Sequence, residues 1–375
     1  MKYALALAYF STFVGFTSLV FKIKLRAIGI GCVCLLMLFS ISLLNDTFGF
    51  IEEKVASFVS FDMYQGHVNT QTFLVQYFLA YVPFTLFQYE YTAHALNMGL
   101  QGFIFVLGMQ YIFYDKPGRW IYLFLLFPAY YNFSIFGLRD PLVNLICTLL
   151  VITVLARKKS EVFPVVCILM SFIALGIRPE FSVMLIGFVG IYLYTISSRY
   201  QRLAILIVGS VAFYYALLFL PLAFGIRSTG SALRNIEIIA QFNELRHDRR
   251  IGGDGSGSHI LDGALYSFPM IFRYPIQVAS SFIAPLPFEI RGGAFVFAFI
   301  ESLVFSFTAF FAAKRCTSNP QSLLLFSCGM LYMLLQALFA INYGNILRIR
   351  YPCYIFFLGS IVSARKLDSE FGFRN

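Results

Sequence analysis

Long apolar runs separated by short charged segments constrain this chain more than any other feature of its sequence. Only 12% of its 375 residues are charged, whereas soluble domains carry about 25%. With 59% hydrophobic residues, the chain has too few ionised groups to cover a soluble globule. This excludes a soluble enzyme, a disordered chain and a secreted disulfide scaffold. The runs are continuous rather than alternating, which favours helices over a β-barrel.

Eleven apolar segments reach or approach the roughly 20 residues that a helix needs to cross a bilayer. They are 3–21, 27–44, 95–114, 120–137, 141–156, 162–177, 181–196, 203–224, 294–313, 322–342 and 351–364. A further segment, 70–88, contains Gln71, Gln76 and Pro83, and we expect it to lie in the membrane interface. The predicted fold is an all-α, polytopic transmembrane helical bundle of about 11 spans, forming a single membrane domain over 1–375.

Basic groups between the runs set the expected orientation, because cytoplasmic loops are enriched in Lys and Arg. They are Lys22-Lys24-Arg26, Lys116-Arg119, Arg157-Lys158-Lys159, Arg199-Arg202, Lys314-Arg315 and Arg365-Lys366. If 70–88 crossed the membrane, the first group would lie opposite the other five. We therefore expect an outside N-terminus and an inside C-terminus. Two long outer segments result, 45–94 and 225–293, and the second contains a semi-apolar stretch expected to form an interfacial helix.

Under this topology, the positively charged residues expected outside the membrane are mostly Arg and rarely Lys. The outside holds two Lys, Lys2 and Lys54, but eleven Arg. Outer cations oppose the orientation rule, and Arg offers a planar fork of donors that matches phosphate and carboxylate. The outer Arg residues are therefore predicted to bind anions, with pairing to nearby acids as the alternative. Beyond the motifs described below, this set includes Arg273 and Arg291.

Three Arg motifs lie at outer membrane boundaries, where two spans are joined by almost no loop. They are Arg139-Asp140-Pro141, Arg178-Pro179-Glu180 and the stretch from Asn342 to Pro352 with Arg348 and Arg350. A Pro just inside a helix is a start signal, and acids are favoured at helix N-termini. Ionisable residues at this depth are candidates for function, with helix capping as the plain alternative.

The two long outer segments carry further candidates. Arg246, His247, Arg249 and Arg250 precede a Gly-rich stretch, 252–257, that we interpret as a mobile lid. His247 is a candidate general base because its ordinary pKa lies near neutrality, although a solvated loop His is the simpler alternative. In the first segment, Asp62 with Tyr64 can bind a sugar hydroxyl or supply a base, or can merely form an exposed turn. No Cys/His group has metal-ligand spacing, so we expect no metal and no cofactor.

The order of these features resembles bacterial O-antigen (Wzy-like) polysaccharide repeat-unit polymerases, within the broader C-type integral membrane glycosyltransferases. The resemblance rests on Asp62-Met63-Tyr64, Arg139-Asp140, Arg178-Pro179-Glu180, the long loop ending in Pro285-Leu286-Pro287-Phe288, and Asn342 to Arg350. It covers most of the chain in layout but depends on short motifs.

The resemblance implies an enzyme of the bacterial inner membrane with its active site facing the periplasm. Such an enzyme joins oligosaccharide units carried on undecaprenyl pyrophosphate, for lipopolysaccharide or a related surface polysaccharide. The Arg residues would hold pyrophosphate, and Asp62, Glu180 or His247 would take the proton of the acceptor hydroxyl. A membrane lipid and a chain-length regulator protein are expected partners, and nucleic acid is not.

Two other functions stay open from the sequence. An acidic base in the first outer segment, Asp62, also fits a glycosyltransferase that uses a polyprenyl-phosphate sugar. A lipid-linked oligosaccharide transporter, or flippase, is the alternative of a different class. Transporters tend to place polar residues at the middle of the membrane, whereas here the mid-span regions hold little charge, with Glu301 as the exception.

Overall fold

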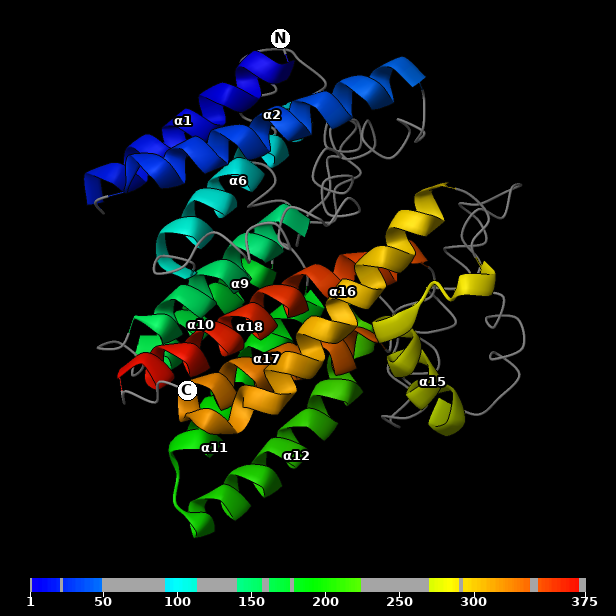
Figure 1. The fold of residues 1–375 in the computed structure, drawn as a ribbon. Coiled ribbons are helices and arrows are strands. Elements are labelled where there is room, and N and C mark those ends of the chain that lie inside the picture. Colours follow the sequence, from blue (N-terminus) through cyan, green and yellow to red (C-terminus); the bar gives the residue numbers. More distant parts are fainter. Residues whose placement is uncertain are drawn as a thin grey trace. The chain divides into compact units, whose positions relative to one another are not determined.

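The computed structural model describes residues 2–20, 23–48, 92–112, 140–156, 162–175, 179–223, 270–289, 293–337 and 343–370. Every regular element in these ranges is helical (Figure 1). The α-helices are α1 (Lys2–Val20), α2 (Leu25–Phe48), α6 (Thr92–Leu107), α9 (Asp140–Leu155), α10 (Phe163–Leu175), α11 (Pro179–Ile196), α12 (Arg199–Ala223), α15 (Met270–Ile283), α16 (Gly293–Arg315), α17 (Pro320–Ala337) and α18 (Tyr343–Glu370). Three short helices join them: a π-helix, η2 (Gly108–Ile112), and the 3-10 helices η4 (Pro287–Glu289) and η5 (Cys316–Ser318).

The all-α class predicted from the apolar runs is confirmed for the described residues. Ten of the eleven predicted spans coincide with described helices, and the interfacial helix expected late in the second outer segment corresponds to α15. The span 120–137 and the segment 70–88 lie outside the described residues. Three described stretches are long and apolar enough to cross a membrane: Leu25–Leu43, His94–Ile112 and Pro320–Ala337. The bundle of about eleven spans and its orientation stay predictions.

The chain divides into two compact units, and the first contains Met1–Ser160 and Leu169–Phe181. Its described helices pack tightly because glycines allow close backbone approach. A Cβ at Gly99 of α6 would lie 2.8 Å from Tyr9 Cβ and 2.9 Å from the Ala6 carbonyl oxygen of α1. Gly102 likewise faces the ring of Phe10. The backbone N–H of Lys24, just before α2, donates to Gln110 Oε1 of η2 at 3.1 Å. Helices α1 and α2 therefore hold α6 on one side.

The second unit contains Glu161–Ile168 and Ser182–Asn375. Its central pair, α17 and α18, is joined by buried hydroxyls. The Oγ atoms of Ser322 and Ser360 are 2.8 Å apart, and each also donates to the carbonyl oxygen of the other residue at 2.9 Å. At the start of α17, Asn319 Nδ2 donates to the Ser363 carbonyl oxygen at 3.1 Å. Small polar residues thus bring two apolar helices into contact, as is common in membrane proteins.

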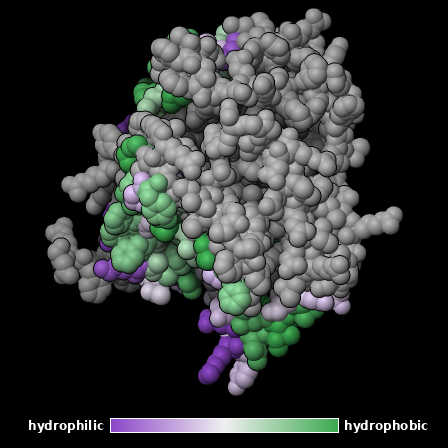
Figure 2. Space-filling view, turned by 90° about the vertical axis from the view of Figure 1, so that its right-hand side faces the viewer, coloured by the Kyte–Doolittle hydropathy of each residue, from purple (hydrophilic) through white to green (hydrophobic). Residues whose placement is uncertain are grey.

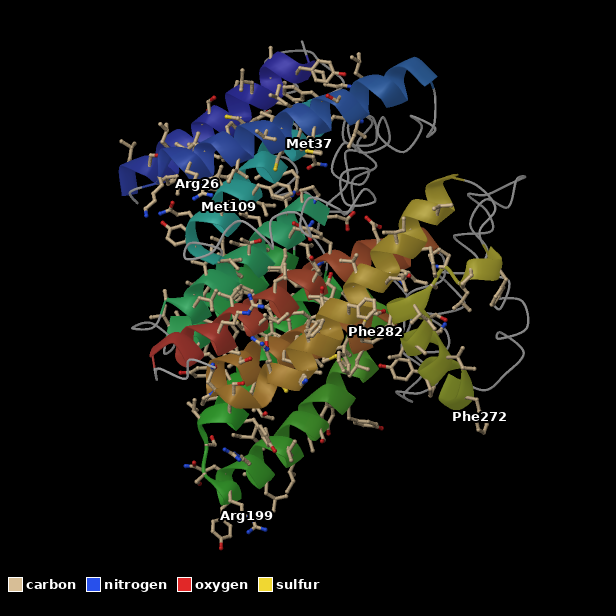
Figure 3. All side chains as sticks on the ribbon, in the orientation of Figure 1. Arg26, Met37, Met109, Arg199, Phe272 and Phe282 are labelled. Atoms are coloured by element: carbon tan, nitrogen blue, oxygen red, sulfur yellow. The ribbon has the colours of Figure 1, made fainter. Side chains whose placement is uncertain are left out.

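Large apolar side chains cover the outer faces of several helices. On α12 and α16 they include Leu203, Ile207, Val211, Phe307 and Phe310, each at least half exposed. A soluble protein does not expose such continuous apolar faces, so these faces fit a lipid environment. Figure 2 shows such surface in green, with hydrophilic residues at its lower tip. Figure 3 labels Arg199, the first residue of α12, at the same end of the view.

Candidate functional site

Of the predicted site residues, the structure describes the side chains of Asp140 and Arg350. Glu180, Arg273 and Arg348 lie in described helices, with side chains outside the part that the structure describes. The remaining candidates are outside the described residues: Asp62, Tyr64, Arg139, Arg178, Arg246, His247, Arg249, Arg250 and Arg291. The Gly-rich stretch 252–257 is outside them as well. The predicted convergence of the Arg residues on one outer cavity stays a prediction.

Arg350 lies near the start of α18 and is the best defined of the candidates. Its side chain is 1% exposed. Nε donates to the Ser281 carbonyl oxygen at 2.8 Å, and Nη2 donates to the carbonyl oxygens of Ser280, at 3.4 Å, and Ala284. All three acceptors belong to the C-terminal end of α15 or the residue after it. The guanidinium therefore ties the start of α18 to the end of α15.

The local sequence explains why carbonyl oxygens are available at this place. The last four carbonyl groups of a helix have no partner within the helix. Pro285 and Pro287 follow α15 and cannot continue it, because proline has no backbone N–H and restricts the backbone. The C-terminal end of a helix also carries partial negative charge, which favours a cation. Arg350 donates to carbonyl oxygens at this end and places a cation beside its partial negative charge, although the Ser280 carbonyl also accepts from the Ala284 backbone N–H at 2.8 Å.

Two residues of α16 complete the surroundings of the guanidinium. Its Cζ lies 5.8 Å from the centroid of the Phe305 ring, within cation–π range. Glu301, one helical turn earlier and 1% exposed, acts electrostatically on Arg350. Phe282, labelled in Figure 3, packs against Phe305 with ring centroids 5.6 Å apart. A buried cation is thus surrounded by a carboxylate, a ring and helix-end carbonyls.

Further hydrogen bonds hold α15 against the same helices. Ser306 Oγ of α16 donates to the Phe282 carbonyl oxygen at 2.9 Å. The Tyr274 hydroxyl of α15 donates to the Leu334 carbonyl oxygen of α17 at 2.7 Å. Phe272 and Ile276, in contrast, are exposed on α15. The helix therefore has one side fixed to the second unit and an apolar side directed outward, as expected for an interfacial helix.

One nitrogen of Arg350 is not used by these contacts. Nη1 is buried and has no hydrogen-bond partner among the described residues, and the same holds for Gln277 Oε1 of α15. Because Nε and Nη2 are occupied by carbonyl oxygens, the predicted role of Arg350 in binding pyrophosphate depends on Nη1. No local pattern in the sequence indicates the structural role of Nε and Nη2.

The three predicted Arg motifs each coincide with the beginning of a helix. Helix α9 begins at Asp140 and α11 begins at Pro179, as the Pro start signals predicted. The third prediction was wrong in detail: α18 begins at Tyr343, so residues 343–350, expected as a short loop, are helical and Pro352 lies inside the helix. The N-terminus of a helix carries partial positive charge and free N–H groups, and it is therefore suited to bind phosphate. Asp140 is 7% exposed and lies in the first turn of α9.

A second group of buried polar residues does not belong to the site predicted from the sequence, which gave only His94 a role, at the membrane interface. His94, Asn97 and Gln101 of α6 are at most 6% exposed, and so are Asn144 and Thr148 of α9. Their spacing of three or four residues along otherwise apolar helices was a detectable signal, since such spacing places side chains on one helix face. Asn97, Gln101, Asn144 and Thr148 carry no charge, so they do not stand out among the charged motifs of the sequence.

No family model, curated protein or solved structure matches this chain. Within the described residues, no group of three or more His, Cys, Asp or Glu side chains is arranged to hold a metal ion.

Proposed function

We propose that this protein is a bacterial inner-membrane glycosyltransferase that polymerises oligosaccharide repeat units at the periplasmic face. The substrates are repeat units linked to undecaprenyl pyrophosphate, and the product is O-antigen or a related surface polysaccharide. The observation that carries the proposal is the coincidence of three Arg motifs with the starts of α9, α11 and α18. Arg139 and Arg178 directly precede α9 and α11, so each of these two motifs would combine a guanidinium with a helix N-terminus, and both favour phosphate.

The proposed reaction transfers a glycan from its lipid carrier to an acceptor sugar. The bond between the anomeric carbon and the pyrophosphate oxygen breaks, and a bond forms from that carbon to the acceptor hydroxyl oxygen. The hydroxyl proton passes to a base, for which Asp62, Glu180 and His247 are the candidates, and undecaprenyl pyrophosphate leaves. Because the leaving group is already activated, the protein chiefly orients the two substrates and stabilises the developing negative charge.

Deletion of the gene, followed by gel analysis of surface polysaccharide, tests this function. A polymerase deletion leaves single repeat units and removes the longer ladder. A ladder of unchanged length would contradict the proposal. Loss of all repeat units would instead support the second candidate, a transporter of lipid-linked oligosaccharide, which the buried polar residues of α6 and α9 favour because transporters bind substrates inside the membrane.

Removing a boundary arginine is expected to abolish polymer formation. Arg178→Ala should lower the polymerisation rate by about 10²–10³-fold, the cost of losing one group that stabilises transition-state charge. If Arg178 donates to two phosphate oxygens, Arg178→Lys should restore little of the polymerisation rate, because Lys lacks the planar pair of donors. The measurement is polymer length in cells that contain equal amounts of each variant. The matched control is Arg199→Ala, an exposed position on α12 that should leave polymer length unchanged. Full-length polymer in Arg178→Ala would remove this residue from the proposed site.

A further inference from the structure

The buried polar residues of the first unit form two stripes. On α6, His94, Asn97 and Gln101 lie on one helix face and are 6%, 5% and 0% exposed. On α9, Asp140, Asn144 and Thr148 follow at intervals of four residues and are 7%, 3% and 1% exposed. At about 1.5 Å per residue, each stripe is roughly 10–12 Å long. Polar side chains are costly to bury, and leucine at these positions would avoid that cost.

The stripe on α6 lies on the side away from α1 and α2. Gly99 and Gly102 face α1, and Val106 packs against Gly31 of α2. With about 100° between successive residues, His94, Asn97 and Gln101 fall roughly opposite these positions. Figure 1 shows α6 between α2 and α9, and α6 packs directly on α9 in this unit.

The stripe on α9 lies on the buried side of that helix. Residues 142, 145, 149 and 152, on the other side, are more exposed. Thr148 Oγ1 donates to the Asn144 carbonyl oxygen at 2.8 Å, so this hydroxyl is satisfied within its own helix. Asn144 Oδ1 is buried and has no hydrogen-bond partner among the described residues. Helix packing alone gives no reason for an asparagine at this position, because a buried acceptor without a partner is unfavourable.

We propose that the α6 and α9 stripes face each other and form a binding site for the hydroxyl groups of a glycan. Amide side chains both donate and accept hydrogen bonds, as sugar hydroxyls do. A carboxylate can accept hydrogen bonds from two sugar hydroxyls. Neither α6 nor α9 contains Lys or Arg, so the stripes do not match phosphate. Both begin at the N-terminal ends of their helices, which the expected topology places at the outer face.

The inference rests on the proposed function for the kind of saccharide that binds. Both a polymerase and a transporter of lipid-linked oligosaccharide must hold a glycan, so the site fits either activity. The competing explanation is that the polar residues only join the helices, since polar side chains commonly do so in membranes. The two explanations differ in what happens when the Asn144 amide, with its unpaired Oδ1, is removed.

Asn144→Leu separates these explanations in the purified full-length protein. Leucine has the same number and branching of heavy atoms as asparagine, and it removes a buried acceptor oxygen that lacks a partner among the described residues. A glycan site therefore predicts an unchanged or higher unfolding temperature and at least about tenfold weaker saccharide binding. The probe is the oligosaccharide mixture obtained by partial hydrolysis of the producing cell's own surface polysaccharide. The matched control is Val151→Leu, an apolar change on the same side of α9 that should leave binding intact. A lower unfolding temperature with unchanged binding would overturn the proposal.

Cysteine labelling gives an independent measurement in membrane vesicles. Asn97→Cys should react with a membrane-impermeant thiol reagent at least about tenfold faster than Val106→Cys, because thiolates form in hydrated places. Val106 is equally buried, but it faces α2. The oligosaccharide mixture should slow the reaction at position 97. Equal reactivity at both positions, or protection by undecaprenyl pyrophosphate but not by oligosaccharide, would overturn the glycan site. Neither outcome depends on the gene-deletion result, so the two proposals can fail separately.

Discussion

Arg350→Ala is expected to destabilise the second unit by about 3–5 kcal/mol, the cost of removing one member of a buried charged group. The change deletes the donors that bind the carbonyl oxygens of Ser280, Ser281 and Ala284. It also leaves Glu301 buried without the cation that acts on it. The measurement is the fraction of full-length protein that elutes as a monodisperse peak after heating in detergent.

Two companion variants make this expectation specific. Arg350→Lys keeps the charge but loses the planar fork, so an intermediate loss of about 1.5–3 kcal/mol is expected from hydrogen bonds to a charged group. Lys314→Ala, at an exposed position of α16, should change stability by less than about 0.5 kcal/mol. Heat resistance of Arg350→Ala equal to that of Lys314→Ala would show that the contacts to α15 contribute nothing.

Gly99→Ala is expected to separate α1 from α6, although alanine is the better helix former. The new Cβ would meet Tyr9 Cβ at 2.8 Å, the Ala6 carbonyl oxygen at 2.9 Å and the Phe10 backbone nitrogen at 3.0 Å. Backbone atoms cannot move aside as a flexible side chain can. Overpacking of this kind costs about 1–3 kcal/mol, which exceeds the gain of up to about 1 kcal/mol in helix propensity.

Two other glycines of the same unit provide matched controls for Gly99. A Cβ at Gly15 of α1 or at Gly29 of α2 would have nothing within 4 Å. Gly15→Ala and Gly29→Ala should therefore be neutral or stabilising by up to about 1 kcal/mol. Thermal unfolding of the three variants in the same detergent measures the difference. If Gly99→Ala is as stable as Gly29→Ala, the two helices are not held by close backbone approach.

The sequence by itself determined the helical class and the places where helices form. Apolar runs of sufficient length predicted ten helices that the structure describes, and the semi-apolar stretch before Pro285 predicted α15. The Pro residues of the boundary motifs correctly marked the beginnings of α9 and α11. These features could be predicted because hydrophobicity and helix start signals act within a window of neighbouring residues.

Only the tertiary structure decided how the side chains of the site are used. Arg350 binds carbonyl oxygens 66 to 70 residues away along the chain, so its role in holding α15 has no local signal. An arginine at position 350 predicted a group able to bind anions. In the folded protein, two of its three side-chain nitrogens instead bind carbonyl oxygens at the end of α15. The stripes on α6 and α9 show the same dependence. Their spacing is local, but their burial depends on which helix faces are covered, and that is set by contacts between distant segments.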